Sequence, residues 1–183
     1  MLQMKQFLLP FWEVAETLAI ALVSLFIIYT FMAQPFIVQG ASMEPSFSDG
    51  DYILIDEITY RFREPQRGEV IVFMNPRNES EFYIKRVIGL PGEEVIVSGD
   101  VVKINGEPLS EEYLPVNYTV TGERVFDLSD DEYFVMGDNR PQSFDSRSWG
   151  ALKRNEIIGT VRLRFWPFGK INIFRGALNY NYS

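Results

Sequence analysis

The sequence predicts one N-terminal transmembrane helix followed by an all-β domain of coiled, barrel-like antiparallel sheets. An apolar run extends from Val14 to Ala33, and beyond it apolar and polar residues alternate in short segments separated by turn residues. A helix of about 20 apolar residues spans a bilayer core, whereas short alternating segments between turn signals are typical of β-strands. We therefore divide the chain into a cytoplasmic head over 1–12, an anchor over 13–34 and an extracytoplasmic β-domain over 35–183.

The composition excludes several classes of function. The 183 residues carry a net charge of −8 and include no cysteine and no histidine. An acidic chain does not present the basic face that nucleic acids need, so we expect no nucleic-acid partner. Structural zinc sites and Ser-His-Asp or Cys-His catalysis are excluded because their ligands or bases are missing. We expect no metal and no cofactor, and any nucleophile must use a lysine, a carboxylate or the amino terminus as its base.

The apolar run is interpreted as an uncleaved anchor. The alternatives are a buried core helix and a cleavable signal peptide, but a signal peptide has a shorter apolar run that ends in small residues. This run carries Phe31 and Met32 and contains Glu16 as its only charged residue. Lys5 precedes the run and no further cation occurs before Arg61. This asymmetry predicts a cytoplasmic N-terminus and a catalytic domain on the outer face of the membrane.

The β-domain is expected to contain a series of short strands separated by turns. Asn105-Gly106 lies between two apolar segments and is a strong cue for a two-residue hairpin. Residues 110–129 are polar and irregular, and we interpret them as an excursion from the sheet. The expected strands are Phe36–Val38, Tyr52–Ile55, Val70–Met74, Phe82–Ile88, Glu94–Val97, Val101–Ile104, Tyr133–Met136 and Ile157–Phe165.

The first stretch whose residues could take part in catalysis comes soon after the anchor and reads Gly-Ala-Ser-Met-Glu-Pro over residues 40–45. Gly40 permits a sharp turn, and Pro45 keeps the preceding residue out of the helical region. Ser42 is therefore expected on a stiff, non-helical loop that presents its hydroxyl. A serine in such a loop is by itself more often a turn residue than a nucleophile.

The second stretch is the cationic strand around Lys85. Alternate side chains of a strand share a face, so Lys85 points with Tyr83 and Val87 while Arg86 points the other way. One of the two adjacent cations must then face the more enclosed side of the sheet. The alternative is that Lys85 is a surface charge and that Arg86 pairs with a carboxylate.

The third stretch, Gly137–Arg147, follows the expected strand Tyr133–Met136 and is rich in Asp, Arg and Ser. Polar groups at the point where a loop leaves a sheet often carry function. The alternative is a loop that is held together by Asp–Arg pairs and Asx turns. The two interpretations are compatible because a functional site needs a supporting shell.

These stretches together resemble bacterial type I signal peptidases. The Ser-Met-x-Pro core resembles the nucleophile motif of that family, and the other two stretches resemble its lysine motif and its Gly-Asp-Asn-Arg motif. The connecting segments are also similar, in the same order along the chain. The segments that carry the resemblance are Gly40–Ser46, Gly50–Leu54, Arg67–Val72, Tyr83–Gly92 and Gly137–Gly150.

The resemblance implies a role for each matching residue. Ser42 would be the nucleophile and Lys85 its general base. Ser143 would be a hydrogen-bond partner of Lys85, and Asp145 and Arg147 would form a structural ion pair beneath the site.

The resemblance also bears on the oxyanion site, and the composition bears on the base. The resemblance implies the backbone N–H of Ser42 as one oxyanion donor, and Gly40 stands where some family members place a serine hydroxyl as a second donor. Without histidine, the serine needs a neutral amine as its base. Lowering the pKa of a lysine from ~10.4 to ~8 costs the charged form about 3 kcal/mol, which burial can impose.

The implied activity is that of a membrane-anchored serine endopeptidase. It would remove signal peptides from secreted preproteins through an acyl-enzyme, cleaving after a small-x-small motif. The expected partners are these signal peptides and the lipid bilayer, with the translocation machinery as a further candidate. We expect the substrate to lie extended beside strands Phe36–Val38 and Phe82–Lys85. Shallow substrate pockets would be lined by Val38, Met43, Tyr83 and Ile84.

Other functions remain as alternatives at this level. One is a self-cleaving Ser-Lys peptidase, although the self-cleaving repressors carry a DNA-binding domain in place of an anchor. Another is a non-catalytic, membrane-tethered relative, which would be expected to lack Ser42 or Lys85. The last is an anchored β-domain that binds peptide or polysaccharide, with coincidental motifs.

Overall fold

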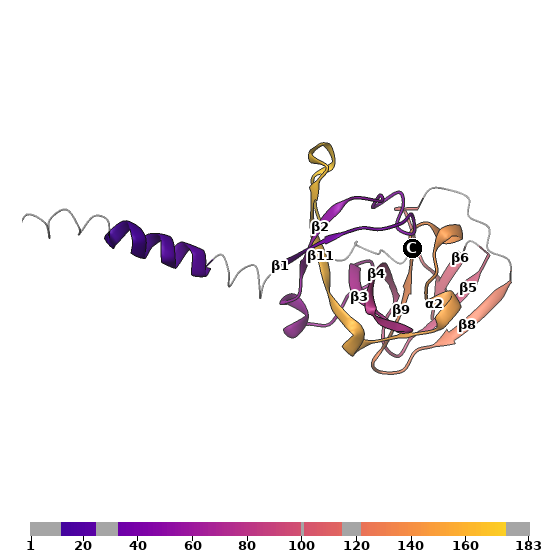
Figure 1. The fold of residues 1–183 in the computed structure, drawn as a ribbon. Helices are drawn as coiled ribbons and strands as arrows, with labels where there is room; N and C mark the ends of the chain where they lie inside the picture. The colour runs from indigo at the N-terminus through magenta and orange to yellow at the C-terminus, as the bar shows by residue number, and fades with distance from the viewer. Residues whose placement is uncertain (1–11, 25–32, 100, 115–121, 175–183) are drawn as a thin grey trace, which may run out of the picture.

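The computed structural model describes residues 12–24, 33–99, 101–114 and 122–174, and from residue 33 onward these form a β-rich body (Figure 1). Residues 12–24 are helical, and every one of them is exposed to solvent. No helix in the described ranges is long and apolar enough to cross a membrane. Residues 25–32 of the predicted anchor lie outside the described part of the chain.

The strands agree closely with the predicted segments. Alternation of apolar and polar residues explains this agreement, because each such segment can bury one face against the core. The strands are β1 (Ala33–Ile37), β2 (Tyr52–Asp56), β3 (Val70–Asn75), β4 (Asn78–Gly89), β5 (Glu94–Ser98), β6 (Val101–Ile104), β7 (Glu107–Pro108), β8 (Glu123–Asp127), β9 (Glu132–Met136), β10 (Leu152–Lys153), β11 (Ile157–Trp166) and β12 (Asn172–Ile173).

Short helical turns connect several of these strands. They are η1 (Thr59–Arg61), η2 (Arg140–Gln142), α2 (Ser146–Trp149), η3 (Arg154–Glu156) and η4 (Phe168–Lys170). Strand β1 begins at Ala33, so the last two positions of the predicted anchor belong to a strand in the structure.

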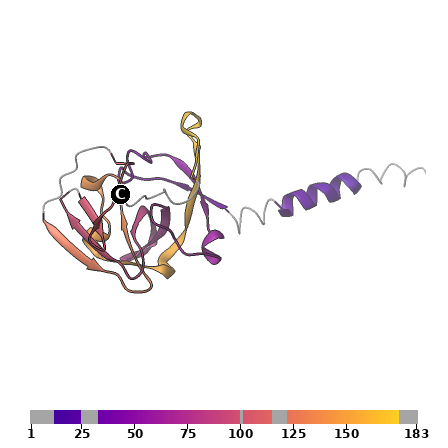
Figure 2. The same cartoon turned by 180° about the vertical axis from the view of Figure 1, so that it is seen from behind.

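The described strands form two antiparallel sheets, which confirms the all-β prediction for this body. The larger sheet has the order β1-β2-β11-β3-β4-β9-β10, with β12 paired to β11, and the smaller has the order β7-β6-β5-β8. Both sheets can be followed in Figure 1, and the reverse view in Figure 2 shows the smaller sheet at the end of the body away from the helix. Among the described strands, the larger sheet is open, with β1 and β10 at its ends.

Two local predictions had different outcomes. Asn105 and Gly106 both have positive φ, and they join β6 to β7 as the predicted two-residue hairpin. The interpretation of residues 110–129 as wholly irregular was wrong, because β8 lies within that range and pairs with β5. Most of β8 is exposed, so its sequence lacks the alternating pattern that identified the other strands.

Buried side chains form three adjoining clusters. The first contains Met43, Phe47 and Ile53, the second contains Phe73 and Val87, and the third packs between the two sheets. The connection from β1 to β2 contributes two fully buried residues, Met43 and Phe47, to the first cluster. This connection is therefore anchored in the core rather than lying loosely on the surface.

Candidate active site

Ser42 and Lys85 meet at the centre of the larger sheet. Ser42 lies in the connection from β1 to β2, and Lys85 lies in β4. The Nζ atom of Lys85 is 2.8 Å from the Oγ atom of Ser42. Although the two residues are 43 positions apart in the sequence, the fold brings their side chains into hydrogen-bond contact.

Lys85 is buried, and its surroundings favour the neutral amine. Lys85 is only 4% exposed, and its Nζ atom also donates to the carbonyl oxygen of Ile84 at 2.8 Å. Burial lowers the pKa of Lys85 to about 8, although the charges of Asp145 and Asp138 oppose the shift and that of Arg147 adds to it. The alternative of a solvated surface lysine is therefore wrong, because the amine lies in a desolvated position.

The loop that carries Ser42 is closed at its base by backbone hydrogen bonds. The N–H of Val38 donates to the carbonyl of Asp51 at 2.9 Å, and the N–H of Gly50 donates to the carbonyl of Val38 at 2.9 Å. The N–H of Gly40 also donates to a carboxylate oxygen of Asp49 at 2.8 Å. These contacts bring the ends of the loop together, so residues 38–51, which we call the nucleophile loop, form one closed unit.

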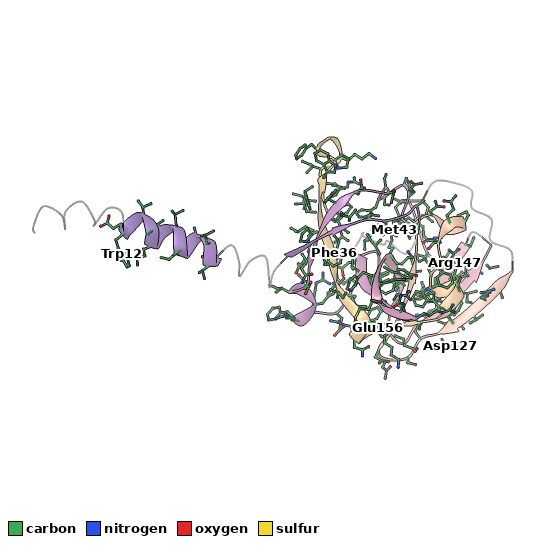
Figure 3. The ribbon with its side chains drawn as sticks, in the orientation of Figure 1. Trp12, Phe36, Met43, Asp127, Arg147 and Glu156 are labelled. Carbon is green, nitrogen blue, oxygen red and sulfur yellow. The ribbon has the colours of Figure 1, made fainter. Side chains whose placement is uncertain are left out.

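Further contacts hold the loop close to Ser42 itself. The N–H of Phe47 donates to the carbonyl of Met43 at 2.9 Å, and the N–H of Asn139 donates to the carbonyl of Ser42 at 3.0 Å. Met43 is fully buried in the core, in line with its position in Figure 3. It is not among the residues that line the groove between β1 and β4, so the structure does not support its predicted place in a substrate pocket.

Gly137 lies at the closest approach between the nucleophile loop and the segment after β9. A Cβ atom at this position would lie 2.2 Å from Ser143 Oγ and 2.4 Å from the carbonyl oxygen of Ser42. The backbone N–H of Gly137 donates to Asp145 at 3.0 Å. A glycine is therefore required here by the space available, and this residue was not among the predicted site residues.

The predicted pair of Asp145 and Arg147 is formed beneath the site. The carboxylate of Asp145 is fully buried and accepts from both Nε and Nη2 of Arg147 at 2.8 Å. Arg147 also donates to the carbonyl of Arg140 at 2.7 Å. The pair thus ties the segment after β9 to α2, directly under Gly137.

Ser143 lies near the pair but does not bond to the lysine in this structure. Its Oγ atom is buried and has no hydrogen-bond partner among the described residues. The hydrogen bonds of Lys85 Nζ in the described part of the chain go to Ser42 and Ile84. The role of Ser143 as a hydrogen-bond partner of Lys85 therefore stays a prediction.

A second cation is buried beside Lys85. Arg86 makes two hydrogen bonds to the carboxylate of Asp138, at 2.9 and 2.6 Å, and also donates to Gly68 and Ser46. Its guanidinium carbon lies 4.1 Å from the centre of the Tyr113 ring. The alternation of the strand therefore buries both cations, on opposite faces, and the expected carboxylate partner of Arg86 is confirmed as Asp138.

The excursion after β7 contributes a buried ion pair that sequence reasoning missed. Glu111 pairs with Arg140, and Nε of Arg140 donates to the carbonyl of Gly137 at 3.1 Å. The pair thereby supports the segment that contacts Ser42. One of two adjacent glutamates in a polar stretch gives no sequence signal of such a contact.

A groove of about 780 Å³ leads to Ser42 and Lys85 between β1 and the first half of β4. Within the described residues, β1 pairs only with β2, and β4 pairs with β9 only from Arg86 onward. Each strand therefore has a free edge toward the groove, and the rings of Phe36 and Phe82 approach to 5.6 Å at its outer end. Its lining residues include Val38, Gly40, Ser42, Ile53, Val72, Tyr83, Ile84, Lys85, Gln142 and Phe144.

The predicted oxyanion position is open toward this groove. The backbone N–H of Ser42 has no acceptor among the described residues. Gly40 has a φ of +82°, and no other atom lies within 4 Å of a Cβ built there. In this conformation a serine at position 40 would be strained, so a glycine suits the backbone. In the described residues, no group of acidic side chains is arranged to hold a metal ion.

A groove with two free strand edges that ends at a hydroxyl and a buried amine is suited to binding an extended peptide. The fold and the site thus define a peptidase. A family model described as "Signal peptidase, peptidase S26" matches residues 11–166. The chain belongs to this family, and it is an enzyme of the signal peptidase I type.

Two curated relatives agree with this assignment. A probable signal peptidase I-2 of Synechocystis sp. is 38% identical over 88% of this chain and 76% of its own length. A signal peptidase I of Leptolyngbya laminosa is 40% identical over 88% of this chain and 83% of its own length. The crystal structure of a signal peptidase I from Enterococcus faecalis V583 is 37% identical, with a TM-score of 0.48 over 54% of this chain and 97% of that one.

Proposed function

We propose that this protein is a membrane-anchored serine endopeptidase that removes signal peptides from secreted preproteins, with Ser42 as nucleophile and Lys85 as general base. The observation that carries the proposal is the 2.8 Å contact between Ser42 Oγ and the buried amine of Lys85. The lowered pKa of that amine, about 8, supports the assignment because a useful base must be partly unprotonated near neutral pH.

Acylation follows from this arrangement. A neutral Nζ of Lys85 takes the proton from Ser42 Oγ while Oγ forms a bond to the carbonyl carbon of the scissile peptide. The resulting oxyanion faces the backbone N–H of Ser42, which has no acceptor among the described residues. The ammonium of Lys85 then returns the proton to the leaving nitrogen, the C–N bond breaks and the mature protein leaves.

Deacylation uses the same two side chains, with water in place of Ser42 as the attacking group. Water enters, Lys85 accepts one of its protons and the oxygen attacks the acyl carbon. Collapse of the second tetrahedral intermediate releases the signal peptide and returns the proton to Ser42. Lys85 can serve in both half-reactions because its second contact, to the carbonyl of Ile84, keeps the amine in place while its lone pair changes partner.

The groove supports an extended substrate with small side chains near the cleavage site. A peptide that adds to the free edges of β1 and β4 alternates its side chains, so every second residue faces the floor. Val38 and Ile84 are buried residues that line this floor, and Tyr83 stands beside them. Alanine-sized groups packed against such side chains would agree with small-x-small cleavage.

The remaining predicted residues have supporting roles in this proposal. Asp145 and Arg147 hold the segment below the site, and Gly40 leaves the groove open beside the oxyanion. Ser143 would hydrogen-bond the ammonium form of Lys85 when that form appears during catalysis. A backbone N–H or a water molecule would supply the second oxyanion donor in the absence of a side chain at Gly40.

The membrane location rests on the sequence. The apolar run from Val14 to Ala33 would form the anchor, and the Lys and Arg distribution would place the catalytic domain outside the cytoplasm. The apolar side chains of residues 12–24 are exposed, which suits a lipid environment better than water. Trp12 at the head of the helix is an example of such an exposed apolar residue (Figure 3).

Single substitutions test the two catalytic assignments. In a cleavage assay with a purified preprotein, we expect Ser42→Ala and Lys85→Arg each to lose at least about a thousandfold in kcat. Lys85→Arg keeps the positive charge, but its guanidinium stays protonated and cannot act as base. Cleavage at wild-type rate by Ser42→Ala, with normal folding shown by circular dichroism, would contradict the proposal.

A further inference from the structure

Strand β11 holds the nucleophile loop through a side chain that does not line the groove. Arg164 on β11 donates through Nη1 to the carbonyl of Ser46 at 2.8 Å and to the carboxylate of Asp51 at 3.0 Å. Its Nε donates to the carbonyl of Lys170 at 2.7 Å. One guanidinium thus joins two points of the loop to the hairpin that projects from the body at the end of β11 (Figures 1 and 2).

Arg164 also neutralises a buried carboxylate. The side chain of Asp51 is only 2% exposed, and besides Arg164 it accepts from the N–H of Ser48 at 2.9 Å. A buried carboxylate that loses its cation carries a large desolvation cost. Removal of the guanidinium would therefore drive Asp51 toward water and pull the second half of the loop with it.

The same guanidinium faces an aromatic anchor of the loop. Phe47 is fully buried, and its ring lies 5.7 Å from the guanidinium carbon of Arg164 and 4.8 Å from the ring of Phe174. The N–H of Phe47 donates to the carbonyl of Met43, the residue after the nucleophile. A shift of Phe47 would therefore reach the backbone beside Ser42 through one hydrogen bond.

Ser46 links this contact to the base. Its carbonyl accepts from Arg164, and its hydroxyl accepts from Arg86 at 3.2 Å. Arg86 is the neighbour of Lys85 on β4. Ser46 thus connects the loop that carries the nucleophile to the strand that carries the base.

We propose that Arg164 is a positioning residue for the reaction: it keeps the nucleophile loop in the conformation in which Ser42 Oγ meets Lys85 Nζ. The inference rests on the proposed function of Ser42 and Lys85. Arg164 does not line the groove, so it acts on the alignment of the nucleophile and not on substrate binding. Misplacement of a reacting group by about 1 Å can cost about a hundredfold in rate.

The chain offers a matched control on the same strand. Arg162 also forms an ion pair at 3.0 Å, with Asp56, and donates to Thr59. These partners lie outside the nucleophile loop. Arg162→Met and Arg164→Met therefore remove the same side chain from the same strand, but only the second change releases the loop.

The test measures the steady-state kinetics of the full-length wild type and of both variants. We expect Arg164→Met to lower kcat at least tenfold with KM changed less than about threefold, and Arg162→Met to change both less than about threefold. A small sulfonyl fluoride without a peptide portion should label Ser42 of the Arg164 variant more slowly by a similar factor. This second readout reports the reactivity of Ser42 without using the groove.

Two further variants keep the test decisive. Arg164→Lys retains the charge but cannot make all three hydrogen bonds, so its kcat should fall between those of the wild type and Arg164→Met even where the methionine variant folds poorly. Asp51→Asn removes the charge that needs neutralisation, and it should make the added loss of kcat from Arg164→Met smaller.

Equal kinetics for the Arg162 and Arg164 variants, or a rise in KM with unchanged labelling of Ser42, would overturn the inference. An inactive Ser42→Ala alongside that result would leave the proposed function intact.

Discussion

At the scale of single residues, burial decides the chemistry of the site. Lys85 and Arg86 are neighbours, and both are almost fully buried, yet their partners differ. Arg86 faces the carboxylate of Asp138, which compensates its charge, whereas Lys85 faces a hydroxyl and a carbonyl. The same strand therefore keeps one cation charged and favours the neutral form of the other.

The lowered pKa of Lys85 predicts a specific dependence of stability on pH. The pKa is about 8 in the folded protein, against an ordinary value of 10.5 for a lysine side chain. Between these values the unfolded chain holds a proton that the folded chain lacks, so this group makes folding more favourable as the pH rises from about 8 to about 10.5. Below about pH 8 the folded state bears the full cost of a buried ammonium, on the order of 3 kcal/mol.

Lys85→Met should remove this contribution. We expect the variant to be more stable than the wild type by an amount that is largest below pH 8 and shrinks by up to about 3 kcal/mol toward pH 10.5. Chemical denaturation of both proteins across this range measures the difference, in which the titration of all other groups largely cancels. A difference that stays constant from pH 7 to 10.5 would contradict the lowered pKa.

At the scale of elements, the site forms where the nucleophile loop contacts the segment that follows β9. The nucleophile loop leaves β1 and returns to β2, and the segment after β9 contacts its backbone through Asn139 and Gly137. Below them, the Asp145–Arg147 pair holds α2 and the same segment together. The position of Ser42 therefore depends on a strand, a loop and a second loop that are distant in sequence.

Gly137→Ala tests this contact. The added methyl group would lie 2.2 Å from Ser143 Oγ and 2.4 Å from the carbonyl oxygen of Ser42, so the backbone of the nucleophile loop must move. We expect a loss of about 1–3 kcal/mol in the free energy of unfolding and a fall in kcat of at least about tenfold.

Gly169→Ala is the matched control for that substitution. A Cβ atom at position 169 would have no neighbour within 4 Å, so we expect stability to change by less than about 0.5 kcal/mol and activity to be kept. Thermal unfolding and cleavage rates of both variants measure these effects. If Gly137→Ala changed stability and activity as little as Gly169→Ala does, the contact between the nucleophile loop and the segment after β9 would be less close than the structure indicates.

At the scale of the whole molecule, the β-rich body has a core of its own. The buried members of the three hydrophobic clusters all come from residues 38–161, and none comes from the helix over residues 12–24. The groove, Ser42 and Lys85 also lie within the body. Folding and peptide-bond chemistry should therefore be separable from membrane attachment.

A truncated protein that lacks residues 1–30 checks this separation. We expect it to unfold at the same denaturant concentration as the full chain and to cleave a short, soluble peptide with a small-x-small site at a comparable rate. If the proposed anchor is correct, cleavage of a preprotein inserted in lipid vesicles should fall, because the truncated enzyme would no longer share the membrane with its substrate. Loss of soluble-peptide cleavage despite a folded β-body would show that the N-terminal segment takes part in the site.

The sequence by itself determined much of the local structure. Alternation located most strands, and the Asn105-Gly106 turn followed from residues that accept positive φ. It also narrowed the choice of catalytic base, because a chain without histidine leaves a lysine, a carboxylate or the amino terminus as the base for a serine. These results depend on properties of neighbouring residues, which a sequence displays directly.

Only the tertiary structure decided which of these residues meet. Strand β8, the Glu111–Arg140 pair and the crowding at Gly137 were not evident from the sequence, and Met43 lies in the core instead of a pocket. Contacts across many residues likewise set the distance between Ser42 and Lys85 and the burial of the amine. The same is true of the hydrogen bonds from Arg164 to the nucleophile loop. Such contacts follow from how sheets and loops pack, and packing is a property of the whole chain rather than of any one segment.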